Sequence, residues 1–189
     1  MAATEIIAPR GQVRTPEEID RGFADGTLFE RSAYRLELLD WYTTPATEQR
    51  LARFLAGEQV TAAERAAWLS TIRAARAAGK TMARVHVIAE PLTDYIRFEL
   101  ACYDSSVTAG EDIRILPADL AGGVDLPSCD YWLFDDIRAA VMYYGDRGAW
   151  LHSEFVTDPA FVAACRSWRD AALSRAIPLN AYLARSTAA

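Results

Sequence analysis

The sequence places a group of polar side chains at the end of one predicted strand and the start of the helix that follows it. The strand covers residues 84–90, and its polar side chains fall on one face because successive strand residues alternate. In open α/β sheets, ligands usually bind beyond the carboxyl ends of strands, where a helix N-terminus also offers free N–H groups. The pattern therefore predicts a ligand pocket, to which a later strand adds two residues. The predicted pocket residues are Arg84, His86, Glu90, Asp94, Arg97, Trp132 and Asp135.

Three interpretations of this group stay open. The guanidinium groups of Arg84 and Arg97 suit a phosphate or a carboxylate, so the pocket could bind a small anionic ligand. In an enzyme acting on such a substrate, His86 would be the acid or base, and Glu90 or Asp94 would orient its ring. In the structural interpretation, the acidic residues cap the helix and the turns, and the arginines form ion pairs.

Motifs of standard catalytic sites are absent from the sequence. There is no Gly-x-Ser-x-Gly nucleophile elbow, no Gly-x-Gly-x-x-Gly and no P-loop. Neither His86 nor His152 has a second ligand at metal-binding spacing, and the three cysteines lie far apart. We therefore expect no metal and no cofactor, and a binding protein is favoured over an enzyme.

Composition excludes two classes of partner. The formal net charge is -6 and the isoelectric point is about 5.0, whereas a nucleic-acid surface needs clustered basic residues. No apolar run reaches the roughly 18 residues that span a bilayer, and the first residues lack the pattern of a signal peptide. The expected location is the cytoplasm, with no direct contact to nucleic acid or membrane.

Helix signals dominate the first part of the chain. Residues 1–14 show no periodicity and are expected to form a flexible tail, and residues 15–80 to form a helical subdomain. Thr15 and Thr61 have the sequence context of helix N-caps. Mixed three- and four-residue spacing predicts a helix over residues 30–42. On that helix the charges of Arg35 and Glu37 would form a solvated face, or contact a partner protein.

Strand signals dominate from residue 84 onward. Two strands, at 84–90 and 113–116, flank a helix and are expected to pair in parallel. A three-strand meander follows, with hairpin turns, and a final helix begins after Asp158. The predicted fold is α/β: a helical N-terminal part packed on a mixed sheet of about five strands over residues 84–183, with flanking helices. The two parts are expected to form one continuous unit over residues 15–183.

Five segments of the chain resemble an uncharacterised actinobacterial family over about residues 27–183. They are FERSAYRLELLDWY, RVHVIAEPLTDYIRFEL, AGEDIRIL, DYWLFDD and VTDPAFVAACRSWRDAAL. Members of that family are often encoded beside helix-turn-helix regulators. The resemblance therefore implies a non-catalytic regulatory or signalling accessory that binds a small ligand or a partner protein such as a transcriptional regulator.

Residues 84–176 also resemble the phospholipase-D-like fold, through WLFDD, the hairpin and DPAFVAACRSWRDAA. Active members of that superfamily carry His-x-Lys and a downstream Asp. Here neither His86 nor His152 is followed by lysine two positions later. A transition-state phosphate would lack its cation, so this resemblance implies the fold without phosphodiesterase activity.

Overall fold

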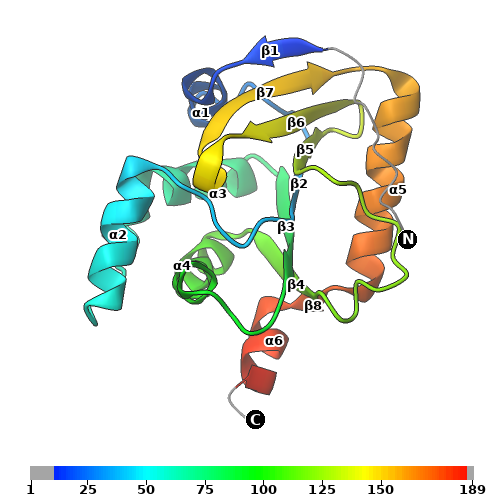
Figure 1. Ribbon diagram of the computed structural model, residues 1–189. Helices are drawn as coiled ribbons and strands as arrows, with labels where there is room; N and C mark the ends of the chain where they lie inside the picture. The colour runs from blue at the N-terminus through cyan, green and yellow to red at the C-terminus, as the bar shows by residue number, and fades with distance from the viewer. Residues whose placement is uncertain (1–10, 187–189) are drawn as a thin grey trace.

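An eight-stranded sheet organises residues 11–186, the range that this computed structural model describes (Figure 1). Within that range the strand order is β1-β7-β6-β5-β2-β3-β4-β8. The strands are β1 (Gln12–Arg14), β2 (Ser32–Glu37), β3 (Thr81–Ile88), β4 (Asp112–Pro117), β5 (Tyr131–Phe134), β6 (Arg138–Tyr144), β7 (Trp150–Val156) and β8 (Ile177–Pro178). The helices are α1 (Pro16–Ala24), α2 (Pro45–Leu55), α3 (Ala66–Ala77), α4 (Asp94–Ala109), α5 (Pro159–Arg175) and α6 (Leu179–Ser186).

Strand β2 joins the parallel and antiparallel parts of this sheet. It runs parallel to β3, which runs parallel to β4. On its other side β2 is antiparallel to β5, and β6, β7 and β1 continue the antiparallel part. The short β8 is antiparallel to β4. Because β2 has neighbours on both sides and packed layers on both faces, five of its six residues are buried.

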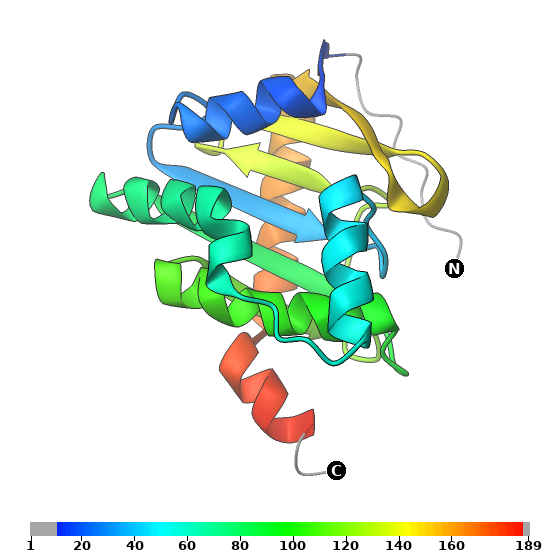
Figure 2. The same ribbon diagram turned by 90° about the vertical axis from the view of Figure 1, so that its left-hand side faces the viewer.

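Helices cover both faces of the sheet. Helices α1, α3 and α4 lie on one face and α5 lies on the other (Figures 1 and 2), while α2 packs against α4. Alternation along β2 sends Tyr34 and Leu36 into the core under α5. Arg35 and Glu37 consequently face the α1, α3 and α4 side.

Side-chain caps fix the starts of the helices, as the sequence predicts. Thr15 and Glu18 form a reciprocal capping box at α1, and Asp158 accepts a hydrogen bond from the backbone N–H of Phe161 at α5. The Thr61 capping box opens a short 3-10 turn, η1 (Ala62–Arg65), which leads into α3. These caps satisfy backbone donors that the first helical turn leaves free.

Several predicted elements are confirmed. The sheet is mixed, and β3 and β4 pair in parallel around α4. Strands β5, β6 and β7 form the predicted antiparallel meander, and α5 begins directly after Asp158.

The predicted extent of the sheet is wrong, because the described residues form eight strands rather than five. Residues 12–14, predicted as part of a tail, form β1 on the edge of the sheet, whereas residues 1–10 lie outside the described range. The predicted helix over residues 30–42 is also wrong, since residues 32–37 form β2. The segment 15–80 is therefore not wholly helical, and it supplies a central strand.

Asp135, in the hairpin turn between β5 and β6, fixes the start of β2. Its carboxylate accepts hydrogen bonds from the backbone N–H groups of Glu30, Arg31 and Ser32, at 2.8, 2.7 and 2.9 Å. Both Asp135 and Asp136 have positive φ, at 54° and 63°, a conformation that Asp and Asn tolerate better than most residues. Burial alone would raise the pKa of Asp135, but the three N–H donors outweigh burial and lower it.

We expect Asp135→Ala to lower the free energy of unfolding by about 2–4 kcal/mol, because three backbone donors lose a charged acceptor. Asp135→Asn, which keeps one acceptor oxygen and tolerates the positive φ, should cost less. Chemical denaturation at neutral pH measures both. Since the folded pKa is lowered, the carboxylate stabilises the fold above its unfolded pKa and loses this effect as the pH falls below it. Equal stability of Asp135→Ala and wild type would contradict this role.

Candidate functional site

A cavity of about 200 Å³ opens on the α1, α3 and α4 side of the sheet, above the carboxyl-terminal half of β2. Aromatic side chains form much of its wall, and its charged groups come from β2, from β3 and, through Asp20, from α1. We call it the aromatic cavity. The residues that line it are Asp20, Phe23, Arg35, Glu37, Tyr42, Thr43, Thr44, Trp68, Arg84, Tyr95, Trp132, Met142, Tyr144, Gly148 and Trp150.

One rim of the aromatic cavity forms where the loop after β2 meets the connection between β6 and β7. The backbone N–H of Thr43 donates to the Gly148 carbonyl at 3.0 Å, and the Thr43 hydroxyl donates to the Arg147 carbonyl at 2.6 Å. Gly148 has φ of 71°, and a Cβ atom there would lie 2.1 Å from the Trp41 carbonyl oxygen. The close approach of the two segments therefore requires glycine.

At the base of the cavity, the carboxylate of Glu37 lies between two arginines. Arg35 Nε donates to Glu37 Oε1 at 2.8 Å, and Arg84 Nη1 lies 2.8 Å from both carboxylate oxygens. The Tyr103 hydroxyl donates to Glu37 Oε2 at 3.0 Å. All four side chains are buried, so these bonds compensate charges that water cannot reach.

Two further carboxyl groups complete the pairing of the arginines. Arg84 Nε donates to Glu111 Oε1 at 3.0 Å. Arg35 Nη2 donates to the Tyr144 hydroxyl at 2.8 Å, and this hydroxyl donates to Asp130 Oδ2 at 3.1 Å. Arg35 Nη2 itself lies 3.7 Å from Asp130 Oδ2.

His86 lies behind this group and is fully buried, with 0% exposure. Its Nδ1 is 2.8 Å from the Tyr103 hydroxyl and its Nε2 is 2.9 Å from the Leu39 carbonyl oxygen. Tyr103 has one hydroxyl hydrogen, which it donates to Glu37. Both ring nitrogens therefore have a hydrogen-bond partner in the interior.

We call the six linked groups the ion network: Arg35, Arg84, His86, Glu37, Glu111 and Asp130. Burial alone would raise the pKa of Glu37, but Arg84 and then Arg35 outweigh burial and hold the pKa far below its ordinary value of 4.5. Burial raises the pKa of Asp130, although Arg35 opposes this. The two arginines pair with three carboxyl groups, so the network leaves no surplus positive charge to attract an anion.

Two guanidinium nitrogens stay available at the base of the cavity. Among the described residues, neither Nη1 of Arg35 nor Nη2 of Arg84 takes part in a hydrogen bond, and neither is among the buried polar atoms without a partner. Since both arginines line the cavity, these donors are the parts of the ion network that a bound molecule can reach.

The structure brings together only some of the predicted pocket residues. Arg84 and Trp132 both line the aromatic cavity. They lie on β3 and β5, the strands on either side of β2. His86 follows Arg84 on the same face of β3 but is sealed beneath the loop after β2 by its bond to Leu39. His86 is therefore a member of the ion network rather than part of the cavity wall.

The other four predicted residues lie elsewhere. Glu90 is exposed and lines a separate cavity beyond β3 and β4. Asp94 and Arg97 are exposed and pair with each other in the first turn of α4. Asp135 lies at the opposite end of the sheet, because β5 runs antiparallel to β2. The enzymatic interpretation requires a hydrogen bond between Glu90 and His86. That bond is not formed, because His86 bonds Tyr103 and Leu39 instead.

The sequence interpretation missed Arg35 and Glu37, the central residues of the site. It assigned them to a solvated helix face, but both are buried, at 7% and 5% exposure. The signal that identifies them is the alternation of Tyr34 and Leu36 with Arg35 and Glu37, which has the period of a strand. Apart from Trp132, the aromatic residues of the cavity come from six separate elements or loops, and no local sequence pattern connects them.

Fold and site together define an open mixed α/β domain with one aromatic cavity over a paired ion network. Among residues 11–186, no three His, Cys, Asp or Glu side chains gather closely enough to hold a metal ion. None of the helices in that range has the length and apolar character needed to cross a membrane.

Comparison with known families places this domain. The family described as domain of unknown function DUF6879 matches residues 17–184, which includes the whole aromatic cavity and ion network. The chain belongs to this family. No protein of curated function matches it in sequence.

We expect Glu37→Gln to lower the free energy of unfolding by about 3–5 kcal/mol, because it leaves two buried arginines without their shared carboxylate. Glu48→Gln, which breaks only an exposed pair with Arg147 at 3.5 Å, should cost about 0–1 kcal/mol. Denaturant unfolding at neutral pH measures both.

The pH dependence gives a second readout for Glu37. Because the folded pKa of Glu37 lies below its ordinary value of 4.5, its stabilisation is complete above that value and is lost as the pH falls through the folded pKa. The difference in stability between wild type and Glu37→Gln should therefore narrow in acid. Similar losses for Glu37→Gln and Glu48→Gln at neutral pH would contradict the central role of Glu37.

Diethylpyrocarbonate, which modifies accessible imidazole groups, should separate the two histidines. His86 has no exposed area and both ring nitrogens are bonded, whereas His152 is half-buried on β7. We expect the native protein to be modified at His152 alone and the unfolded protein at both, as read by peptide mass spectrometry. Native modification of His86 at the rate of His152 would show that solvent and substrates reach it.

Proposed function

We propose that this protein is a binding domain that holds a small, uncharged, planar molecule in the aromatic cavity. The observation that carries the proposal is the pair of free guanidinium donors at the base of a cavity whose walls are aromatic. Ligand sites typically combine apolar walls with a few placed polar groups. The cavity has about the volume of six or seven water molecules, which suits a single ring with one substituent.

The aromatic walls favour a flat ligand. Trp68, Trp132 and Phe23 come from three different elements and pack with their ring planes inclined by 58 to 81° and their centroids 4.8 to 6.4 Å apart. Trp150 is half-buried at the rim. A planar ligand gains both buried area and ring–ring contact from such surfaces.

The ion network favours a neutral ligand with a hydrogen-bond acceptor. Arg35 and Arg84 offer donors, so an amide or ring carbonyl finds partners there. Their charges are already matched by carboxylates, and an added anion would meet Glu37 at the same place. This neutral ligand differs from the anionic ligand that the sequence predicts from Arg84. The carboxylates that pair with Arg84 are Glu37 on β2 and Glu111, directly before β4, and the local sequence around Arg84 does not reveal them.

We propose that this binding has a regulatory or signalling role, in which a partner protein responds to whether the ligand is bound. The resemblance to proteins encoded beside helix-turn-helix regulators supports it. A hydrolytic role like that of phospholipase-D enzymes gains no support from the site, because His86 is sealed and lacks the neighbouring lysine.

Three probes that share one ring and differ in charge test the proposal: benzamide, benzoate and benzylamine. We expect benzamide to raise the melting temperature most, because it offers a carbonyl acceptor without adding charge. It should also change the fluorescence of the protein, since three of the five tryptophans line the cavity.

Matched aromatic variants locate the binding. Trp150→Leu removes a half-buried ring from the cavity rim and should weaken benzamide binding about 3- to 10-fold. Tyr143→Leu removes a half-buried ring that packs in the cluster under α5 and does not line the cavity, so it should leave binding unchanged. Equal effects of the two variants would refute the site, and a preference for benzoate would show that the ligand is anionic.

A further inference from the structure

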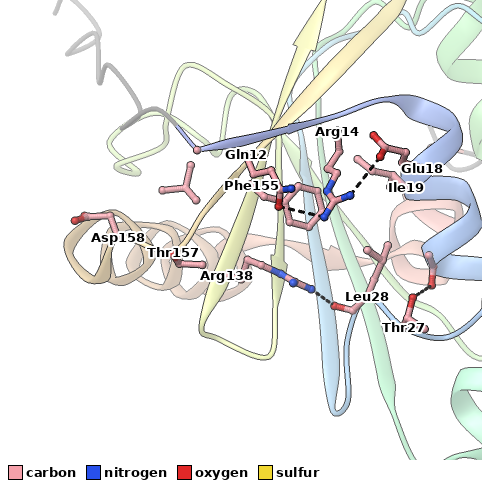
Figure 3. A pocket seen from close by; sticks show the side chains of 13 residues that line it. Gln12, Arg14, Glu18, Ile19, Thr27, Leu28, Arg138, Phe155, Thr157 and Asp158 are labelled. Atoms are coloured by element: carbon pink, nitrogen blue, oxygen red, sulfur yellow. Dashed lines mark hydrogen bonds and ion pairs between the residues drawn. The ribbon is translucent and has the colours of Figure 1, made fainter.

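Arg138, the first residue of β6, lies in a second groove on another part of the molecule (Figure 3). The groove consists of two adjoining cavities of about 590 and 360 Å³, which share the lining residues Thr27, Leu28, Arg138 and Thr157. Its walls come from β1, α1, the loop before β2 and the start of α5. None of these residues lines the aromatic cavity.

The guanidinium of Arg138 is held in place by aromatic rings and one carbonyl. Its central carbon lies 5.7 Å from the ring centroid of Phe134 and 5.1 Å from that of Phe155. Nη2 donates to the Leu28 carbonyl at 2.5 Å, as Figure 3 shows. The group is therefore positioned before any ligand arrives, which lowers the entropy cost of binding.

No carboxylate of the part of the chain that the structure describes forms an ion pair with Arg138. Nε of Arg138 is buried without a hydrogen bond among residues 11–186. Nη1 also lacks a partner in that range but is not fully buried. Burial lowers the pKa of Arg138, the charge of Asp135 opposes this, and the charge of Arg14 adds to the lowering, so the net effect of the surroundings is to destabilise the guanidinium charge.

Three of the carboxylates around the groove bond other groups, whereas Glu30 on its edge is exposed. Glu18 pairs with Arg14 at 3.2 Å and accepts from the Thr15 backbone N–H. Asp158 caps α5 through the backbone N–H of Phe161. Asp135 accepts from three backbone N–H groups at the start of β2. None of the three forms an ion pair with Arg138, although the charge of Asp135 acts on it from a greater distance.

A second donor lies on the same groove. Thr157, just before the N-cap of α5, is exposed, and its hydroxyl forms no hydrogen bond among the described residues. We propose that this groove binds an oxyanion, the phosphate or carboxylate group of a small molecule, between Nη1 of Arg138 and the hydroxyl of Thr157. The oxyanion supplies a direct ion-pair partner for Arg138, through charge-assisted hydrogen bonds.

Inorganic phosphate and acetate, each compared with chloride at equal ionic strength, test this site and distinguish the two sources of the oxyanion. We expect at least one of them to raise the melting temperature of the wild type by about 2–4 °C at saturating concentration. Arg138→Met, which keeps the length of the side chain but removes its charge, should weaken binding about 10- to 100-fold in titration calorimetry.

Two further variants keep the test decisive. Thr157→Val changes an exposed side chain and should fold, and it should weaken binding even if Arg138→Met proves unstable. Arg114→Gln removes a guanidinium that pairs with Asp112 on β4, so it should bind like wild type. Wild-type shifts equal to those in chloride, or equal weakening by Thr157→Val and Arg114→Gln, would overturn the proposal. Neither result depends on what the aromatic cavity binds.

Discussion

The contact on which the rest of the site depends is the carboxylate of Glu37 held between Arg35 and Arg84. It joins β2 to β3 through side chains as well as backbone, and Tyr103 extends it to α4. A single buried charge in this position would cost several kcal/mol, whereas a closed set of opposite charges offsets most of that cost. The buried histidine fits the same arrangement as a further donor.

This arrangement explains why a cavity exists at the centre of a packed sheet face. Apolar side chains from α1 and α3 pack on one side of the ion network, and those of α4 pack on the other. Between these two packed sides lie the charged groups of the ion network, which need polar partners. Aliphatic side chains alone therefore cannot fill the space above them. Large aromatic rings surround the gap instead. The same pairing that allows the arginines to be buried also removes their attraction for anions.

The sequence predicts most of the second half of the fold, because its signals there are local. Strand β3, helix α4, the meander and α5 each carry their own alternation, cap or turn. Prediction from the sequence fails at β2, because this strand is buried on both faces. Its charged residues face the interior instead of the solvent. Arg84 and Trp132 could be assigned to a pocket from sequence, but their real neighbours, Arg35 and Glu37, are adjacent only through long-range strand pairing.

The position of β2 also determines when the protein can fold during its synthesis. Ala33 pairs with Phe134, so one side of β2 lacks its neighbour until the ribosome has released the chain beyond that residue. Until then one edge of β2 is unpaired in the nascent chain. Its buried charged residue Arg35 also lacks Asp130, one of its partners in the folded protein. Long-range pairing of this kind slows folding and prolongs exposure to aggregation. The first half of the chain therefore cannot complete its part of the sheet as an independent folding unit.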